Sequence, residues 1–184
     1  MGVSGSGKTT VGLRLAAALG YEFRDADDYH SSASVEKMRH GEPLTDEDRM
    51  PWLARLRDVI ERALAESTGV VLACSALRAS YRDLLLPRNG GLITIYLRVG
   101  RDIVRQRVEA RPSHFMPTAL IESQFAALEE PENAVSVDAN QPEDQVVAEA
   151  IGAIYTMRHA GFTASQPTQP DCRRDRAPGG SEQR

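Results

Sequence analysis

The residues Gly2-Val3-Ser4-Gly5-Ser6-Gly7-Lys8-Thr9-Thr10 form the most informative segment of this 184-residue chain. They fit the pattern G-x-x-x-x-G-K-[ST], which is typical of loops that bind polyphosphates. The glycines let the backbone curl so that consecutive N–H groups point at phosphate oxygens, and a helix that begins here adds the positive end of its dipole. In such loops Lys8 reaches the β- and γ-phosphates, and the Thr9 hydroxyl ligates Mg²⁺. The segment therefore predicts a P-loop that binds ATP, with Lys8 as a catalytic cation.

Only Met1 precedes this loop in the sequence. A P-loop normally joins the end of a buried parallel strand to a helix. Either about six to ten residues precede Met1 in a longer chain, or the sheet forms without this strand. We expect the first alternative, because the remaining segments predict a complete enzyme. A chain that begins at Met1 should then be less stable than one extended upstream.

The composition is ordinary for a globular protein, with 41% hydrophobic and 26% charged residues. The formal net charge of −4 argues against a nucleic-acid partner, which would favour a basic surface. The apolar runs are too short to predict a membrane span, and no secretory signal is visible. The two cysteines, Cys74 and Cys172, fit a reducing cytoplasm without disulfides. We therefore expect a cytoplasmic protein with neither a nucleic-acid nor a membrane partner.

Apolar spacing predicts strands that alternate with helices. The expected helices span residues 10–19, 51–68, 75–86, 101–111, 118–130 and 142–156, and the expected strands span residues 21–24, 70–74, 92–97 and 134–137. Residues 31–48 are polar and predict a short helix and loop on the substrate side. The alternation predicts an α/β fold with a parallel sheet, in the three-layer α/β/α arrangement of P-loop NTPases with a helical lid. The usual first strand of that sheet is missing from this chain.

Two aspartates, Asp25 and Asp27, follow the expected strand 21–24. Ligands of parallel α/β sheets bind at the carboxyl ends of the strands, so this position is chemically informative. Alternation along an extended segment would put both carboxylates on one side. One would hold Mg²⁺ through water, and the other would accept the proton of a substrate hydroxyl during phosphoryl transfer. The alternative is a solvated acidic turn.

Basic residues gather in two further places. Arg105, Arg107 and Arg111 lie on the expected helix 101–111, where a lid would bring positive charge to the transferring phosphoryl group. A solvated basic helix face is the equal alternative. The cations expected on the substrate side are Lys37, Arg49, Arg78 and Arg82, of which one or two would meet the carboxylate of an anionic substrate.

Several segments outside the loop match one family in order and in spacing. The most specific are Asp25-Ala26-Asp27-Asp28-Tyr29-His30, Pro51-Trp52-Leu53, Cys74-Ser75-Ala76-Leu77 and His114-Phe115-Met116-Pro117. Together with the P-loop they resemble the gluconate kinases (gluconokinases), a family of P-loop small-molecule kinases related to shikimate kinase. The resemblance extends over residues 2 to about 156.

The resemblance implies a cytoplasmic enzyme that uses ATP and Mg²⁺ to phosphorylate the terminal hydroxyl of D-gluconate, giving 6-phospho-D-gluconate. It also implies a homodimer. We expect a kinase domain over residues 1–160, with a lid at about 105–130. Residues 161–184 are polar and carry almost nothing apolar, which predicts a disordered tail.

The same resemblance implies roles for individual residues. Asp25 would lie near the water shell of Mg²⁺, and Asp27 would contact the reacting hydroxyl as its base. Arg107 and Arg111 match catalytic arginines of the lid, and residues 138–142 match the adenine side. The residues implied on the gluconate side are Asp27, His30, Lys37, Arg49 and Arg82.

The sequence departs from the family pattern at Ala26, where the family usually has glycine. We expect this change to have little effect, because the position should not need positive φ. Shikimate kinase, or another small-metabolite kinase, is the nearest rival function. An ATP-binding module without activity is a second alternative, if the missing strand is absent in the cell. A GTPase is disfavoured, because no N-K-x-D or D-x-x-G segment accompanies the P-loop.

Overall fold

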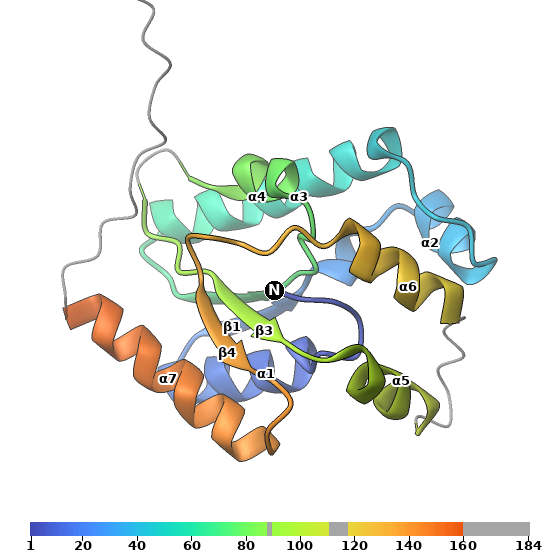
Figure 1. Ribbon diagram of the computed structural model, residues 1–184. Helices are drawn as coiled ribbons and strands as arrows, with labels where there is room; N and C mark the ends of the chain where they lie inside the picture. Colours follow the sequence, from blue (N-terminus) through green and yellow to red (C-terminus); the bar gives the residue numbers. More distant parts are fainter. Residues whose placement is uncertain (88–89, 111–117, 160–184) are drawn as a thin grey trace, which may run out of the picture.

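The structure is a computed structural model that describes residues 1–87, 90–110 and 118–159. Within these ranges the strands form two parallel pairs (Figure 1). β1 (Glu22–Asp25) pairs with β2 (Val70–Ala73), and β3 (Ile95–Arg98) pairs with β4 (Val135–Asp138). The parallel pairing and the alternation with helices confirm the predicted α/β fold.

The helices form a layer on each side of the strands. α1 (Lys8–Leu19) and α7 (Glu143–His159) cover one face, and α3 (Asp46–Ala65) and α4 (Ala79–Leu85) cover the other (Figure 1). The remaining helices lie beyond the carboxyl ends of the strands; they are the 3-10 helix η1 (Ala26–Tyr29), α2 (Ser32–Arg39), α5 (Arg101–Glu109) and α6 (Thr118–Ala127). The three layers leave the carboxyl ends of β1 and β2 beside the P-loop.

Two helix starts differ from the prediction by four residues or more, each for a local reason. α3 begins at Asp46 rather than Pro51, because Thr45 and Asp48 form a capping box, so Pro51 lies inside the helix. α4 begins at Ala79 rather than Ser75, because Ala76 adopts a left-handed conformation with φ of 42° that a helix does not allow. The predicted helix 75–86 was therefore wrong over its first four residues.

The core consists of two clusters, one on each side of the strands. The first packs α1 and α7 against β3 and β4, with Val11, Leu15, Leu97, Val137 and Val147 among its buried residues. The second packs α3 and α4 against the end of β2, with Trp52, Leu53, Leu56, Ile60 and Tyr81 among its members. Trp52 is 4% exposed, so it is a packing residue of this second cluster.

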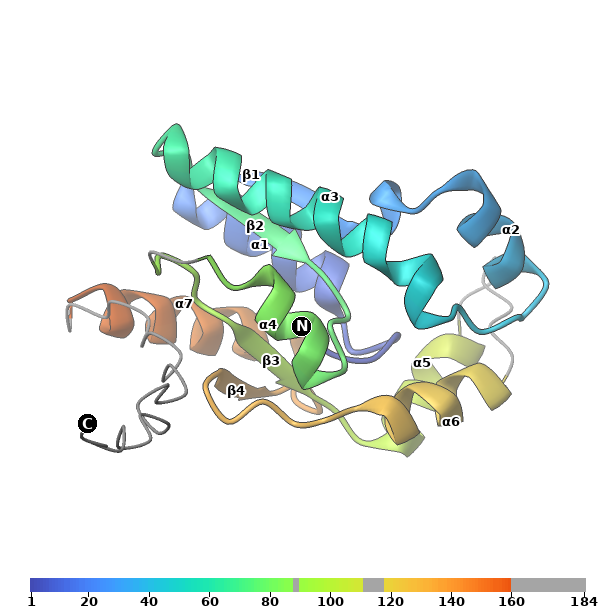
Figure 2. The same ribbon diagram turned by 90° about the horizontal axis from the view of Figure 1, so that it is seen from above.

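Met1 lies between the two strand pairs (Figure 2). Leu97 N donates to Met1 O at 2.9 Å, and Gly2 N donates to Ser75 O at 3.4 Å. The backbone that enters the P-loop is therefore bonded to the β3 side through Met1 and to the β2 side through Gly2. The strands do not form one continuous sheet across this point in the described part of the chain.

Some predictions fall on residues outside the described ranges. These include Arg111, the segment around His114, the cysteine Cys172 and the tail 161–184. Cys74, in contrast, lies buried directly after β2. Burial raises the pKa of its thiol to about 11.

None of the helices in the described ranges combines the length and apolar character needed to cross a membrane.

Candidate active site

The P-loop curls around the amino-terminal end of α1. Gly7 is the N-cap of this helix with φ of 94°, and Gly5 has φ of 78°. Both values lie in the left-handed region that favours glycine. A Cβ at Gly5 would also lie 3.1 Å from Cγ1 of Val104 on α5, so this helix packs directly against the loop. The loop therefore leads into the first turn of α1, where the positive end of the helix dipole lies.

Lys8 lies at the first position of α1. Its Nζ donates to Val3 O at 3.0 Å, so the side chain turns back over the loop from which it extends. A cation in this position faces the space that the loop encloses. This geometry fits the predicted contact of Lys8 with the phosphates of ATP.

Thr9 and Asp25 join the P-loop helix to the end of β1. Thr9 Oγ1 donates to Asp25 Oδ2 at 2.9 Å, and the other carboxylate oxygen of Asp25 accepts from Asp27 N at 3.1 Å. Asp25 thus caps η1, and the chain turns at Asp27 instead of continuing as a strand. The aspartates lie at the predicted edge, but the expected alternation along an extended segment was wrong. Ala26 has no positive φ, as expected.

The carboxylate of Asp27 has a raised pKa. Loss of water around the carboxylate is the larger cause, and the negative charge of Asp25 is the second; Lys8 and His30 act in the opposite direction. The residue keeps an exposed surface, so the desolvation is partial and a small molecule can still reach the carboxylate. A carboxylate with a raised pKa is a better proton acceptor than an ordinary aspartate.

His30 and Trp52 stack beside Asp27. Their rings are parallel within 6°, with centroids 4.6 Å apart, and Trp52 Nε1 donates to Ala26 O at 2.7 Å. Burial lowers the pKa of His30, which favours the neutral ring at pH 7. Its Nδ1 is buried and has no hydrogen-bond partner among the described residues. The stack therefore holds a polar ring atom next to the candidate base.

Arg49 and Arg78 lie against the ring of Tyr81. Their Cζ atoms lie 5.7 Å and 5.6 Å from the ring centroid. The Tyr81 hydroxyl donates to Asp46, which also accepts from Arg78 at 3.1 Å, and Arg49 donates to Leu44 O. The hydrogen bond from Tyr81 and the charge of Arg78 lower the pKa of Asp46. The guanidinium groups of both arginines thus lie against one aromatic ring. Tyr81 and Asp46 were not predicted as site residues.

Lys37 and Arg82 make contacts within the protein. Lys37 Nζ lies 2.8 Å from each carboxylate oxygen of Asp48, the residue of the α3 capping box. Arg82 donates to the carbonyl oxygens of Ala76 and Leu77 at 3.0 Å and 2.9 Å. Arg82 thereby supports the left-handed turn at Ala76, at the carboxyl end of β2.

The basic residues of α5 are paired with neighbouring elements. Arg101 and Arg105 both contact Glu122 of α6, the first at 2.8 Å, and this pairing raises the pKa of Arg105. Arg107 Nη2 donates to Ala139 O at 2.8 Å, in the segment 138–142 that was expected on the adenine side. The structure thus places Arg107 at the loop after β4.

Gln124 of α6 reaches the P-loop itself. Ser4 N donates to Gln124 Oε1 at 2.7 Å, and Gln124 Nε2 donates to Ser4 Oγ at 3.1 Å. This residue was not predicted as a site residue, because an amide on a helix carries no spacing signal. The paired contact fixes the position of the loop relative to α6.

The comparisons with known proteins agree with this arrangement. The family described as "Shikimate kinase" matches residues 4–155. The chain is 48% identical over 165 residues to a protein of Mus musculus named "Probable gluconokinase", covering 78% of this chain and 90% of the relative. The chain belongs to the gluconokinase family. It is also 41% identical over 158 residues to the "Thermoresistant gluconokinase" of Escherichia coli (strain K12), covering 84% of this chain and 90% of that protein.

A solved structure supports the membership in the gluconokinase family. A gluconokinase from Sinorhizobium meliloti 1021 superposes with a TM-score of 0.77 at 41% sequence identity. The superposition covers 87% of this chain and 91% of that chain. The family resemblance that the sequence predicted is therefore confirmed, together with the α/β fold of a P-loop kinase.

Proposed function

We propose that this chain transfers the γ-phosphoryl group of ATP to the terminal hydroxyl of D-gluconate, giving 6-phospho-D-gluconate. The single observation that carries the proposal is the junction of the P-loop with the end of β1, where Thr9, Asp25 and Asp27 meet. The relatives named gluconokinases support the substrate. The catalytic unit would comprise residues 1–160, with α5 and α6 in a lid at about 105–130.

ATP would lie with its phosphates on the P-loop, residues 2–10, where Lys8 supplies the positive charge. Thr9 and Asp25 would hold Mg²⁺, Asp25 through water, because both offer the oxygen donors that Mg²⁺ prefers. When bound, Mg²⁺ neutralises charge on the β- and γ-phosphates. No cluster of three or more metal-binding side chains occurs in the described ranges, so the phosphates and water would complete the shell.

Asp27 would act as the base. The oxygen of the terminal hydroxyl forms a bond to the γ-phosphorus, the bond from the γ-phosphorus to the bridging oxygen of ADP breaks, and the hydroxyl proton passes to the Asp27 carboxylate. The raised pKa of Asp27 favours this transfer. Lys8 would stabilise the charge that develops on the phosphoryl oxygens.

Gluconate would lie between η1 and Tyr81, whose ring supports Arg49 and Arg78. His30 would contact a hydroxyl through its buried Nδ1, and Arg49 would bind the carboxylate, with Arg78 beside it on the same ring. Lys37 would support the gluconate side through its ion pair with Asp48. Arg82 would support it through its hydrogen bond to the turn at Ala76. Arg107 would have to leave Ala139 to reach the phosphates, as would be expected of a lid residue together with Arg111.

A coupled assay of ADP formation with D-gluconate, shikimate and a panel of sugar acids tests the function. We expect turnover with D-gluconate that requires Mg²⁺ and is lost in Lys8→Ala. Turnover with shikimate and not gluconate would reject the substrate. Binding of ATP without turnover of any acceptor would reject the kinase function.

Two further proposals rest on the family resemblance and the composition. We propose a homodimer, which sedimentation at several protein concentrations would test. We also propose a cytoplasmic location, which the buried, reduced Cys74 supports. Fractionation of the source cells would test the location.

A further inference from the structure

The segment that follows α6 is hydrogen-bonded to the turn between β2 and α4. Glu129 N donates to Leu77 O at 2.9 Å, and Ala79 N donates to Glu129 Oε2 at 2.6 Å. These two contacts lie on either side of Arg78 in the sequence, so Glu129 holds the backbone both before and after that residue. We call residues 75–79 the Arg78 turn.

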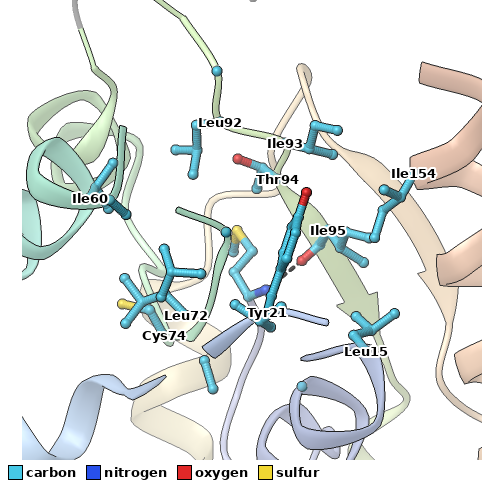
Figure 3. A pocket seen from close by; sticks show the side chains of 18 of the residues that line it. Leu15, Tyr21, Ile60, Leu72, Cys74, Leu92, Ile93, Thr94, Ile95 and Ile154 are labelled. Carbon is cyan, nitrogen blue, oxygen red and sulfur yellow. Dashed lines mark hydrogen bonds between the residues drawn. The ribbon is translucent and has the colours of Figure 1, made fainter. Parts of the chain in front are cut away.

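The Arg78 turn is supported by hydrogen bonds from two other places in the chain. Its residue Ala76 has φ of 42°, a left-handed value that is strained for a residue with a Cβ. Figure 3 shows Cys74, the residue before the turn, beside Leu72 on the wall of a cavity of about 540 Å³, which Ala76 and Arg82 also line. Arg82 supports the turn from α4, and Glu129 supports it from a distant segment. Because part of the turn borders a cavity, packing alone does not fix its strained conformation, and these hydrogen bonds contribute to it.

Glu129 also completes the first turn of α4. The N-cap of this helix is Arg78, whose side chain makes no capping hydrogen bond. The first amide of the helix, Ala79 N, donates instead to the Glu129 carboxylate. A negative charge is favourable at this end of a helix, because the first N–H groups have no partner within the helix. The Glu129 carboxylate therefore replaces the side-chain cap that Arg78 does not supply.

The side chain of Arg78 extends from this turn to the ring of Tyr81. Arg78 Nη1 lies 3.1 Å from each carboxylate oxygen of Asp46, and its Cζ lies 5.6 Å from the ring centroid. Arg49 lies against the same ring and 3.8 Å from Asp46. A shift of the backbone at Arg78 would therefore disturb both guanidinium groups, which share one ring and one carboxylate.

The same stretch of chain also holds the nucleotide side. Gln124, which precedes Glu129 on α6, makes two hydrogen bonds with Ser4 of the P-loop. One stretch thus contacts both the loop proposed for the phosphates and the turn that carries Arg78. The two contacts involve different residues, so loss of one should affect one substrate more than the other.

We propose that Glu129 is a positioning residue for the anionic substrate. It acts through the Arg78 turn rather than on the reacting atoms, and it holds this turn so that Arg78 and Arg49 meet the substrate carboxylate together. The inference rests on the proposed function for the identity of the substrate. Any anion that these two arginines bind would depend on the same support.

Variants at two acidic residues of one segment test the proposal. Glu129→Ala removes the acceptor of Ala79 N, whereas Glu129→Gln keeps an oxygen that can accept this hydrogen bond. Glu132→Ala and Glu132→Gln are the matched controls, because Glu132 is an exposed acid in the same segment. The double variant of Glu129→Ala with Arg78→Ala measures whether Glu129 acts through Arg78. Steady-state kinetics with gluconate and ATP are combined with amide exchange at Ala79, which is measured without substrate.

We expect Glu129→Ala to raise the KM for gluconate by about 3- to 10-fold, with the KM for ATP unchanged and with faster exchange at Ala79. Glu129→Gln should recover most of the affinity, and the Glu132 controls should behave like the original chain. The double variant should bind gluconate no more weakly than Arg78→Ala alone. Additive effects, an equal rise in the KM for ATP, or unchanged exchange at Ala79 would each overturn the proposal.

Failure of the proposed function would give a different result. Absence of gluconate turnover in the unaltered chain would reject the proposed function, whatever the variants do. The role of Glu129 would then be decided by the exchange at Ala79. Faster exchange in Glu129→Ala than in Glu132→Ala would support the hold on the Arg78 turn, and equal exchange in the two variants would overturn it.

Discussion

The Thr9 hydroxyl donates a hydrogen bond of 2.9 Å to Asp25 Oδ2, across 16 residues of sequence. The bond joins the first turn of α1, where the phosphates would lie, to the carboxyl end of β1, where the proposed base Asp27 follows. Asp25 also accepts from Asp27 N, so one carboxylate orients both the Thr9 hydroxyl, the proposed metal ligand, and the turn that carries Asp27. This arrangement makes Asp25 the structural centre of the site.

Substitutions at this junction should weaken the response to Mg²⁺. We expect Thr9→Ala and Asp25→Asn each to reduce activity by about 10- to 100-fold at low Mg²⁺, with partial recovery at high Mg²⁺. The measurement is ADP formation across a Mg²⁺ series at saturating gluconate. Thr68→Ala, which removes a hydroxyl that donates to Ala63 O at the remote end of α3, serves as the control. An unchanged Mg²⁺ dependence in both variants would contradict the metal site.

Asp27 should control the acid side of the pH profile. Its raised pKa means that it keeps its proton to a higher pH than an ordinary aspartate, so activity should fall as the pH drops through this raised pKa. Asp27→Asn should lower kcat by about 10²- to 10⁴-fold. The fall of activity at low pH, which is the acid limb of the profile, should then disappear. In Asp25→Asn one cause of the raised pKa is removed, so the limb should move to lower pH. A limb that stays in place in Asp25→Asn would assign it to another group.

The sequence predicted the types of the helices and strands well, and the contacts between distant segments poorly. The helix expected over 10–19 and the strand expected over 70–74 are present as Lys8–Leu19 and Val70–Ala73, because apolar spacing reports burial directly. The start of α3 was missed although Thr45 and Asp48 have the spacing of a capping box. The left-handed Ala76 was not predictable, because alanine carries no turn signal and Arg82 stabilises the turn from a later helix.

The candidate site residues show the same difference between local motifs, which were predicted, and contacts with distant segments, which were not. The aspartates and the P-loop lie where the motif placed them, because a motif describes local backbone. The acceptors of Lys37 and Arg107 depend on segments distant in sequence, so residue type alone could not identify Asp48 or Ala139. Gln124 was missed for the same reason, since its partner lies 120 residues away.

The two arginines on Tyr81 should determine the affinity for gluconate. We expect Arg49→Lys and Arg78→Lys to raise the KM for gluconate by about 10-fold or more, since a charged hydrogen bond is lost or misdirected, with little change in the KM for ATP. Arg14→Lys is the matched control, because Arg14 pairs with Glu143 and Asp144 on the opposite side of the strands. A rise confined to the KM for ATP would place these arginines on the nucleotide side.

Gln124 should hold the P-loop in its binding conformation. Gln124→Ala removes both contacts with Ser4, and we expect a rise of about 2- to 10-fold in the KM for ATP, with the KM for gluconate unchanged. The neighbouring Ser123→Ala, whose hydroxyl donates to Leu120 O within α6, should behave like the original chain. Equal effects on both substrates would indicate a general loss of structure.

Trp52 should link stability to substrate binding. Its indole N–H bonds the buried Ala26 O, so Trp52→Phe removes this hydrogen bond and should cost about 1 kcal/mol in the free energy of unfolding. The smaller ring also loosens the stack that positions His30, so the KM for gluconate should rise while the KM for ATP stays constant. Urea unfolding and steady-state kinetics on the same preparation separate the two effects. Leu13→Ala, at a side chain exposed on α1, should change neither quantity appreciably. A destabilised Trp52→Phe with an unchanged KM for gluconate would show that the stack does not position His30 for the substrate.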